Sequence, residues 1–393
     1  MPVRTIILHS GGRTGGSMEN NDPKRAICNG FSCWIIILSA ALVFSCAESN
    51  EDWPNFGYDG QNTAYVPGGT GITEPIFKWQ FQADGAFKTS PIVSNGVVYA
   101  GNEDTFFYAI DEAKGKVIWR YKTERAIGST AALSGDRVFF GGSDNILHAL
   151  DRATGAPQWQ RQTSGTITAG PVISEDVVLF GSWDYSIYAI NKNNGDHIWS
   201  LRTNGPVTAT PALYGNVAIF GSWDGNVYAL KKTTGELVWQ FSTDGGVASA
   251  PAVMDGVVYV GSRDHHLYAL DADEGTLIWK AEGDAWFDAS PAVTSNLVIA
   301  ANYDHRVYGI YRNSGEVAWT FTGEGPILSS PVVAGDVVYV GSWRRVLHAL
   351  SLSDGAELWR LPVRGNVDGS PAISNRTIYI GSHDGLLHAI GNR

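Results

Sequence analysis

Cysteine is almost absent from the chain, which has three cysteines among 393 residues. All three, Cys28, Cys33 and Cys46, lie in the N-terminal segment. Residues 47–393 therefore contain no internal disulfide and no thiol for redox chemistry or metal binding. We expect an exported domain that is held together by side-chain packing alone.

The chain also lacks an excess of positive charge and any long helical pattern. Its formal net charge is −11, so it does not offer the basic surface with which nucleic-acid-binding proteins neutralise phosphates. Glycine and tryptophan, by contrast, are abundant, with 46 and 14 copies. Such a composition is typical of short strands joined by tight turns, and we predict an all-β protein that does not bind nucleic acid.

The N-terminal segment has the order of a signal peptide. Lys24 and Arg25 precede an apolar run that spans residues 34–44. The run ends at Cys46 in a sequence that resembles the lipobox of bacterial lipoproteins, although Phe44 stands where a small residue is usual. The resemblance implies export and a lipid on Cys46, with the polar residues 47–52 as a tether.

Two alternatives to the lipid anchor remain open. Residues 31–47 are at the lower length limit for a helix that crosses a bilayer, and plain secretion would also follow from a cleaved signal peptide. A start at Met18 would give a more compact signal. In each case we expect the rest of the chain to lie outside the cytoplasm, on the periplasmic or extracellular side.

A 40-residue repeat extends from Glu74 to Arg393. Tryptophan keeps this spacing without an insertion or deletion, and proline and glycine recur with the same period. Repeats of this length are typical of propellers and solenoids. We predict that the periodic tryptophans are structural residues that dock on the adjacent unit. They are Trp79, Trp119, Trp159, Trp199, Trp239, Trp279, Trp319 and Trp359.

Each unit contains four short strands with apolar residues on both faces, as in a sheet that packs between two others. A recurring aspartate between the second and third strands is expected to stabilise a turn and not to bind metal. The last unit lacks its tryptophan strand, and the strand of Trp79 precedes the first complete unit. Pairing these ends would close a ring. We predict an eight-bladed β-propeller of four-stranded blades over residues 74–393, after a leader (1–46) and a tether and entry segment (47–73).

Two segments resemble the PQQ-repeat, or quinoprotein-like, propeller family. Residues 151–159 are similar to its tryptophan-docking motif, and residues 52–67 are similar to its entry segment. The resemblance extends from Trp53 to the end of the chain. Enzymes of this family hold PQQ over the channel beside two adjacent cysteines, with calcium and a catalytic aspartate on long loops.

The chain lacks the adjacent cysteines, and its units of equal length leave no long loop for a cofactor pocket. We therefore expect no catalytic residue, metal or cofactor. The alternative is a PQQ-dependent dehydrogenase, which would bind PQQ and calcium. The eight units, the lipobox-like cysteine and the short tether also resemble the BamB family of outer-membrane assembly lipoproteins. That resemblance implies a monomeric, non-catalytic scaffold that binds an envelope protein or a small ligand at its loop face.

The first candidate binding position is the residue before the turn aspartate, which is often aromatic. Aromatic side chains serve as anchors in protein interfaces and also stack on sugars, so a carbohydrate-binding or sensor propeller is a further alternative. Packing between loops is the ordinary interpretation of the same residues. The candidates at this position are Trp183, Trp223, Tyr303 and Trp343.

The second candidate position lies three residues before the periodic proline and holds Lys88, Asp288 and Asp368. If this position faces the channel mouth, these residues form a charged cluster with Trp286 and Arg364 close by. The mouth is where a quinoprotein holds its cofactor. Solvated charges on a loop rim are the simpler interpretation.

Overall fold

The computed structural model describes residues 52–69 and 71–393. The predicted leader, the lipidation site Cys46 and residues 47–51 of the tether lie outside these ranges, so the anchor stays a prediction. None of the described residues belongs to a helix that is long and apolar enough to span a membrane.

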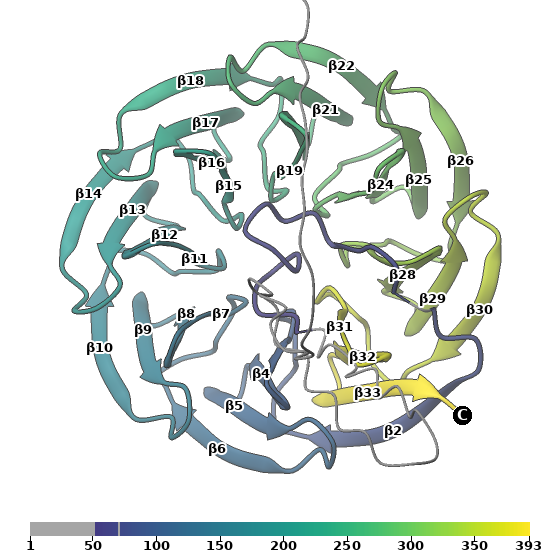
Figure 1. The fold of residues 1–393 in the computed structure, drawn as a ribbon, viewed down its shortest axis with the longest axis horizontal. Helices are drawn as coiled ribbons and strands as arrows, with labels where there is room; N and C mark the ends of the chain where they lie inside the picture. Colours follow the sequence, from purple (N-terminus) through teal and green to yellow (C-terminus); the bar gives the residue numbers. More distant parts are fainter. Residues whose placement is uncertain (1–51, 70) are drawn as a thin grey trace, which may run out of the picture. The chain divides into compact units, whose positions relative to one another are not determined.

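The described chain forms eight blades of four antiparallel strands each around a central channel, and one blade gains a short parallel fifth strand (Figure 1). The innermost strand of each sheet is short, and the outermost strand carries the periodic tryptophan. The predicted all-β eight-bladed propeller is therefore confirmed.

The strands are numbered along the chain, and each blade is counted from its innermost strand. Blades 1 to 4 consist of β3 (Ile92–Ser94), β4 (Val97–Gly101), β5 (Phe106–Asp111) and β6 (Val117–Lys122); β7 (Ala132–Ser134), β8 (Arg137–Gly141), β9 (Ile146–Asp151) and β10 (Pro157–Gln162); β11 (Val172–Ser174), β12 (Val177–Gly181), β13 (Ser186–Asn191) and β14 (His197–Arg202); and β15 (Ala212–Tyr214), β16 (Val217–Gly221), β17 (Asn226–Lys231) and β18 (Leu237–Ser242).

Blades 5 to 8 continue around the ring. They consist of β19 (Ala252–Met254), β20 (Val257–Gly261), β21 (His266–Asp271) and β22 (Leu277–Glu282); β23 (Ala292–Val293), β24 (Leu297–Ala301), β25 (Arg306–Tyr311) and β26 (Val317–Thr322); β27 (Val332–Ala334), β28 (Val337–Ser342), β29 (Val346–Ser351) and β30 (Glu357–Pro362), with β1 (Tyr65–Val66) added beside β27; and β31 (Ala372–Ser374), β32 (Thr377–Gly381), β33 (Leu386–Asn392) and β2 (Pro75–Gln82).

The ring closes through its two ends, as the incomplete last unit predicts. Strand β2 pairs antiparallel with β33, in a register that runs from Pro75 opposite Asn392 to Gln82 opposite Leu386. Blade 8 thus takes its outer strand from the N-terminal side of the repeats and its other strands from the C-terminal end (Figure 1).

One contact repeats between neighbouring blades. The Nε1 of Trp279 in blade 5 donates a hydrogen bond to the carbonyl of Arg312 in blade 6 at 2.8 Å. Its indole covers Gly315, which has a φ of 75°, and a Cβ on that glycine would lie 2.8 Å from the ring. The other docking tryptophans bond the next blade in the same way, except that Trp359 donates to Ile72 in the segment before β2.

The turn aspartate bonds both the backbone and a tyrosine. In blade 5, Asp264 accepts hydrogen bonds from the N–H groups of Asp244 and His266, at 2.9 and 3.0 Å. It also accepts a hydrogen bond from the Tyr268 hydroxyl, at 2.7 Å from Oδ2. Burial and the neighbouring Asp264 carboxylate raise the pKa of Tyr268, so this phenol stays a hydrogen-bond donor.

The entry segment crosses one end of the channel (Figure 1). Backbone N–H groups of successive inner strands donate to its carbonyl oxygens, for example from Leu213 to Gly60 at 2.7 Å and from Val293 to Thr63 at 2.8 Å. Asn62, which is 2% exposed, donates its side-chain Nδ2 to the carbonyl of Pro251 at 3.0 Å. The segment closes this end, which we call the plug face.

Candidate functional site

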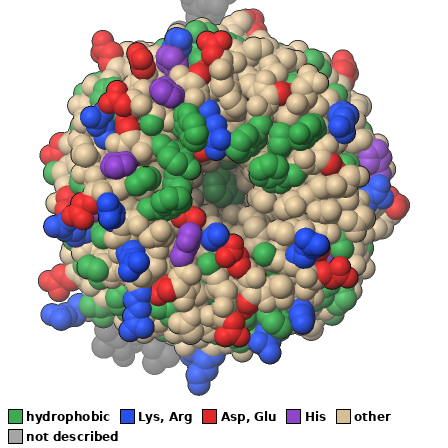
Figure 2. Space-filling view, turned by 180° about the vertical axis from the view of Figure 1, so that it is seen from behind, with side chains coloured by type: hydrophobic (Ala, Val, Ile, Leu, Met, Phe, Trp, Pro, Cys, Tyr) green, Lys and Arg blue, Asp and Glu red, His purple; other side chains and the backbone are tan. Residues whose placement is uncertain are grey.

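The opposite end of the channel is open. Each inner strand begins after the loop that precedes the periodic proline and ends near the entry segment. The loops before the periodic prolines therefore lie at the end of the channel opposite the plug face. Seen from behind Figure 1, the molecule is hollowed at its centre, and hydrophobic side chains gather around the hollow (Figure 2). We call the loops around this opening the mouth.

Two tryptophans of blades 3 and 4 lie side by side at the mouth. The rings of Trp183 and Trp223 are 5.7 Å apart between centroids. Each indole Nε1 already donates to a threonine hydroxyl, from Trp183 to Thr168 at 2.9 Å and from Trp223 to Thr208 at 2.7 Å. Because these N–H groups are satisfied internally, the indoles offer apolar surface to solvent, and Trp183 is 42% exposed.

Arg263 of blade 5 extends this surface. Its Cζ lies 4.0 Å from the ring centroid of Trp223 and 4.6 Å from that of Trp286. The guanidinium also makes a bidentate ion pair with Asp288, at 2.9 and 2.7 Å. Stacking and the ion pair together fix the arginine between the two indoles.

Tyr303 of blade 6 completes the set, with its ring 5.6 Å from that of Trp286. Burial raises the pKa of Tyr303, the carboxylates of Asp288 and Asp368 raise it further, and Arg263 opposes them. We call Trp183, Trp223, Arg263, Trp286 and Tyr303 the aromatic arc.

The other side of the mouth is polar. Asp368 accepts a hydrogen bond from the Nε1 of Trp343 at 2.5 Å, and its second oxygen lies 2.7 Å from the Nε2 of His383. Lys88 forms an ion pair with Glu103 at 2.7 Å. Lys88, Asp288 and Asp368 thus each have their own partner at the mouth and do not pair with one another.

The structure joins the two candidate positions into one surface. Side chains at the position before the turn aspartate bond side chains at the position three residues before the periodic proline. The partner lies in the same blade, as for Trp183 and Thr168, or in the next blade, as for Arg263 and Asp288. Arg364 is exposed, and no ion pair joins it to this set in the part of the chain that the structure describes.

Sequence reasoning missed the roles of Arg263, Glu103 and His383. All three occupy the same repeat position as Trp183, directly before the turn residue. This shared position could have identified them as residues of the mouth.

The mouth does not fit PQQ and calcium. No cysteine follows Cys46, so the paired thiols that would stack on the quinone are missing. Residues 52–69 and 71–393 contain no group of three or more His, Cys, Asp or Glu side chains that could hold a metal ion. Asp288 and Asp368, the two acidic candidates at the mouth, are each engaged by a neighbouring side chain.

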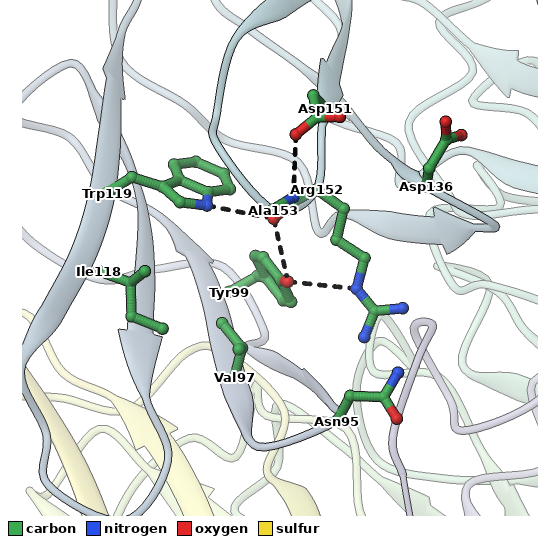
Figure 3. Close-up of a pocket in the computed structure, with 9 residues that line it drawn as sticks. All are labelled: Asn95, Val97, Tyr99, Ile118, Trp119, Asp136, Asp151, Arg152 and Ala153. Carbon is green, nitrogen blue, oxygen red and sulfur yellow. Dashed lines mark hydrogen bonds between the residues drawn. The ribbon is translucent and has the colours of Figure 1, made fainter.

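Two clefts lie between blades and away from the mouth. One, of about 340 Å³, separates blades 1 and 2 and contains Trp119, Tyr99 and Arg152 (Figure 3). Trp119 donates to the carbonyl of Arg152 at 3.1 Å, and the Arg152 Nε donates to the Tyr99 hydroxyl at 3.2 Å. A similar cleft of about 460 Å³ lies beside Trp79, between blades 8 and 1. Because both clefts adjoin a docking tryptophan, they follow from the repeat geometry.

A family model described as outer membrane protein assembly factor BamB matches residues 77–126, 107–243 and 223–392. The crystal structure of BamB from Moraxella catarrhalis is similar with a TM-score of 0.71 and 22% identity, over 81% of this chain and 99% of that one. Quinohemoprotein alcohol dehydrogenase from Comamonas testosteroni has a TM-score of 0.77 and 15% identity, over 87% of this chain and 81% of that one.

The computationally designed Ika8 protein is also similar, with a TM-score of 0.71 and 16% identity, over 81% of this chain and 99% of that one. A comparison with curated protein sequences found no significant match. At these identities the solved structures show a common fold, and the fold is shared by an assembly factor, an oxidoreductase and a designed protein.

Proposed function

The chain belongs to the PQQ-repeat family described as outer membrane protein assembly factor BamB, and from this premise we propose that it is a non-catalytic scaffold of the cell envelope. It is exported, anchored through a lipid on Cys46, and binds another envelope protein at the mouth. The process it serves is outer-membrane protein assembly, and it acts as a monomeric propeller without a cofactor.

The aromatic arc is the observation that carries this proposal. The indole N–H groups of Trp183 and Trp223 are used within the chain, and Arg263 is neutralised by Asp288, so much of the exposed surface is apolar. Rigid aromatic side chains lose little conformational entropy on binding, and Trp, Tyr and Arg are the usual anchors of protein interfaces. A sugar would need several donors and acceptors beside the stacking face, and those of Trp183, Trp223 and Arg263 are already engaged, which makes a polypeptide the better fit.

The uniform blades also support a scaffold. Thirty-two of the 33 strands belong to four-stranded blades, and the remaining strand, β1, is part of the entry segment that closes the plug face. No blade of residues 75–392 carries a long insertion in which catalytic groups would be held over the channel.

Complementation in cells tests the scaffold. The source organism, deleted for this gene, would receive the wild-type chain or a Trp183→Ala/Trp223→Ala variant, and the abundance of folded outer-membrane β-barrel proteins would be measured. We expect the double variant to fall toward the level of the deletion strain at equal protein abundance. A Tyr311→Ala control removes an aromatic side chain that is 48% exposed outside the mouth, and it should complement. Full complementation by the double variant would reject the mouth as the binding surface.

The likeness to quinohemoprotein alcohol dehydrogenase keeps PQQ-dependent oxidation as a second candidate. The purified protein would be mixed with PQQ and calcium and desalted, and quinone absorbance and dye reduction by alcohols and sugars would be recorded. Retained quinone with turnover would reject the scaffold and make Asp288 and Asp368 the first residues to replace.

Sugar affinity that falls when Trp183, Trp223 or Trp343 is replaced by Ala would favour a carbohydrate-binding propeller.

A further inference from the structure

The outer strands of blades 8 and 1 carry an unusual set of side chains for an acidic chain. Residues 75–82 and 116–122 contain four basic residues and no acidic one, although the net charge of the whole chain is −11. The basic residues are Lys78, Lys116, Arg120 and Lys122, and all four are exposed.

Exposed apolar side chains accompany these cations. Ile76 and Phe77 on β2 are each 38% exposed, and Val117 and Ile118 on β6 are 40% and 50% exposed. The two strands are neighbours on the circumference, because Trp79 of β2 docks on the turn that precedes β6 (Figure 1). We call these four basic and four apolar residues the edge strip.

The cations of the edge strip are not neutralised within the described chain. Lys78 donates to the Thr377 hydroxyl at 3.0 Å, and the Arg120 guanidinium lies 4.5 Å from the centroid of the Phe106 ring. No carboxylate among residues 52–69 and 71–393 forms an ion pair with any of the four. Their charge is therefore available to an anionic partner.

The N-terminal side of the chain is fixed next to this strip. The Asp52 carboxylate accepts hydrogen bonds from the Ser94 hydroxyl at 2.6 Å and from the Asn95 N–H at 3.0 Å, both in blade 1. Asn95 and Ile118 line the same cleft (Figure 3). The attachment point of the tether and the edge strip therefore lie at one side of the ring.

The length of the tether limits the distance to the anchor. Six peptide units join Cys46 to Asp52, and even a fully extended chain of this length spans at most about 20 Å. A lipid on Cys46 would therefore hold blade 1 close to the bilayer surface.

We propose that the edge strip lies on the surface of an anionic lipid bilayer, with its cations at the headgroups and its apolar side chains at the interface. The proposal rests on the lipid anchor of the proposed function. Lys and Arg attract anionic headgroups, and exposed aliphatic and aromatic side chains partition into the interface. Contact through this edge leaves the aromatic arc on blades 3 to 6 free for a protein partner.

The ring provides a matched control for the test. Ile278 occupies the same repeat position as Ile118, four blades away, and is 49% exposed compared with 50%. A genetically encoded fluorescent amino acid would replace either Ile118 or Ile278 in the full chain. Each labelled protein would be reconstituted into phosphatidylcholine vesicles with or without phosphatidylglycerol. Quenching by lipid-attached nitroxides reports contact with the bilayer.

We expect several-fold stronger quenching at position 118 than at position 278, and a further increase with phosphatidylglycerol. Reversing the charge of the strip with Arg120→Glu/Lys122→Glu should abolish the increase, whereas Lys280→Glu on blade 5 should preserve it. Equal quenching at the two positions would overturn the proposal.

The mass of the N-terminal peptide reports separately on the anchor. An unlipidated chain that still shows the difference in quenching would reject the anchor and retain the edge strip as a lipid-binding surface. A lipidated chain without the difference would retain the anchor and reject the strip.

Discussion

Trp279 and Trp286 are close in sequence but belong to two regions with opposite properties. Trp279 is 8% exposed, bonds the next blade, and covers a glycine that has no room for a side chain. Trp286 is 41% exposed at the mouth and contacts Arg263 and Tyr303. The docking contact recurs in seven of the eight blades, whereas the mouth contact occurs once. Residues that recur every 40 positions hold the ring together, whereas residues that differ from blade to blade are available for binding.

The sharpest test of this contrast replaces each tryptophan with alanine. We expect Trp279→Ala to lower the free energy of unfolding by about 3 to 5 kcal/mol, because it leaves a cavity between two blades and an unpaired Arg312 carbonyl. Trp286→Ala should cost less than about 1 kcal/mol, because this residue is 41% exposed and lies at the surface of the mouth. Urea unfolding followed by circular dichroism measures both. Similar losses for the two variants would mean that the mouth is part of the structural core.

The fold could be predicted because it depends on the periodic positions. The 40-residue spacing of Trp79 to Trp359 gives the number of blades, and the unpaired strand of Trp79 gives the way the ring closes. Both follow from local sequence and from the need to pair every strand edge. The path of the entry segment could not be derived in the same way, because most of its bonds to the inner strands are made by backbone groups that are identical in every residue.

The candidate site was only partly predictable. The sequence gives the two variable positions of the mouth, yet it does not say which residues meet. Trp183 turns to Thr168 within its own blade, whereas Arg263 reaches Asp288 in the next one. That choice depends on side-chain length and charge in three dimensions. The role of Arg263 as the link between two indoles follows only from the structure.

A second comparison concerns blades 5 and 8. Tyr268 of blade 5 bonds its turn aspartate, but the equivalent residue of blade 8 is His388, which is fully buried and bonds Gln80 and Ser382. Burial lowers the pKa of His388 to about 4, Asp384 opposes this shift, and Arg364 adds to it. The folded protein therefore holds this imidazole neutral.

This burial predicts a loss of stability in acid. Between pH 6.5 and about 4 the unfolded chain binds a proton at His388 that the folded chain does not, so stability falls as the pH falls. The full loss below this range is about 3 kcal/mol. His388→Tyr, which installs the residue of blade 5, should remove this component of the pH dependence. The exposed His197→Gln control should keep it, and an unchanged pH profile in His388→Tyr would contradict the assignment.

The smallest expected effect concerns the pair of Tyr268 and Asp264 within one blade. Burial alone would raise the pKa of Asp264, but hydrogen bonds from Tyr268, the backbone and Ser262 outweigh it and lower the pKa. Tyr268→Phe removes one of these bonds from a buried carboxylate and should lower the free energy of unfolding by about 1 to 2 kcal/mol at neutral pH. The loss should shrink in acid as Asp264 becomes protonated.

Tyr259→Phe is the matched control, because this hydroxyl in the same blade has no hydrogen bond to any residue that the structure describes. Its loss should stay below that of Tyr268→Phe at pH 7 and should not depend on the protonation of Asp264. If both variants lost the same stability at every pH, the aspartate would be a turn residue only, and the repeated tyrosine would contribute through its ring alone. A difference confined to neutral pH would instead assign part of each blade's stability to a hydrogen bond between periodic side chains, as distinct from the docking contact between blades.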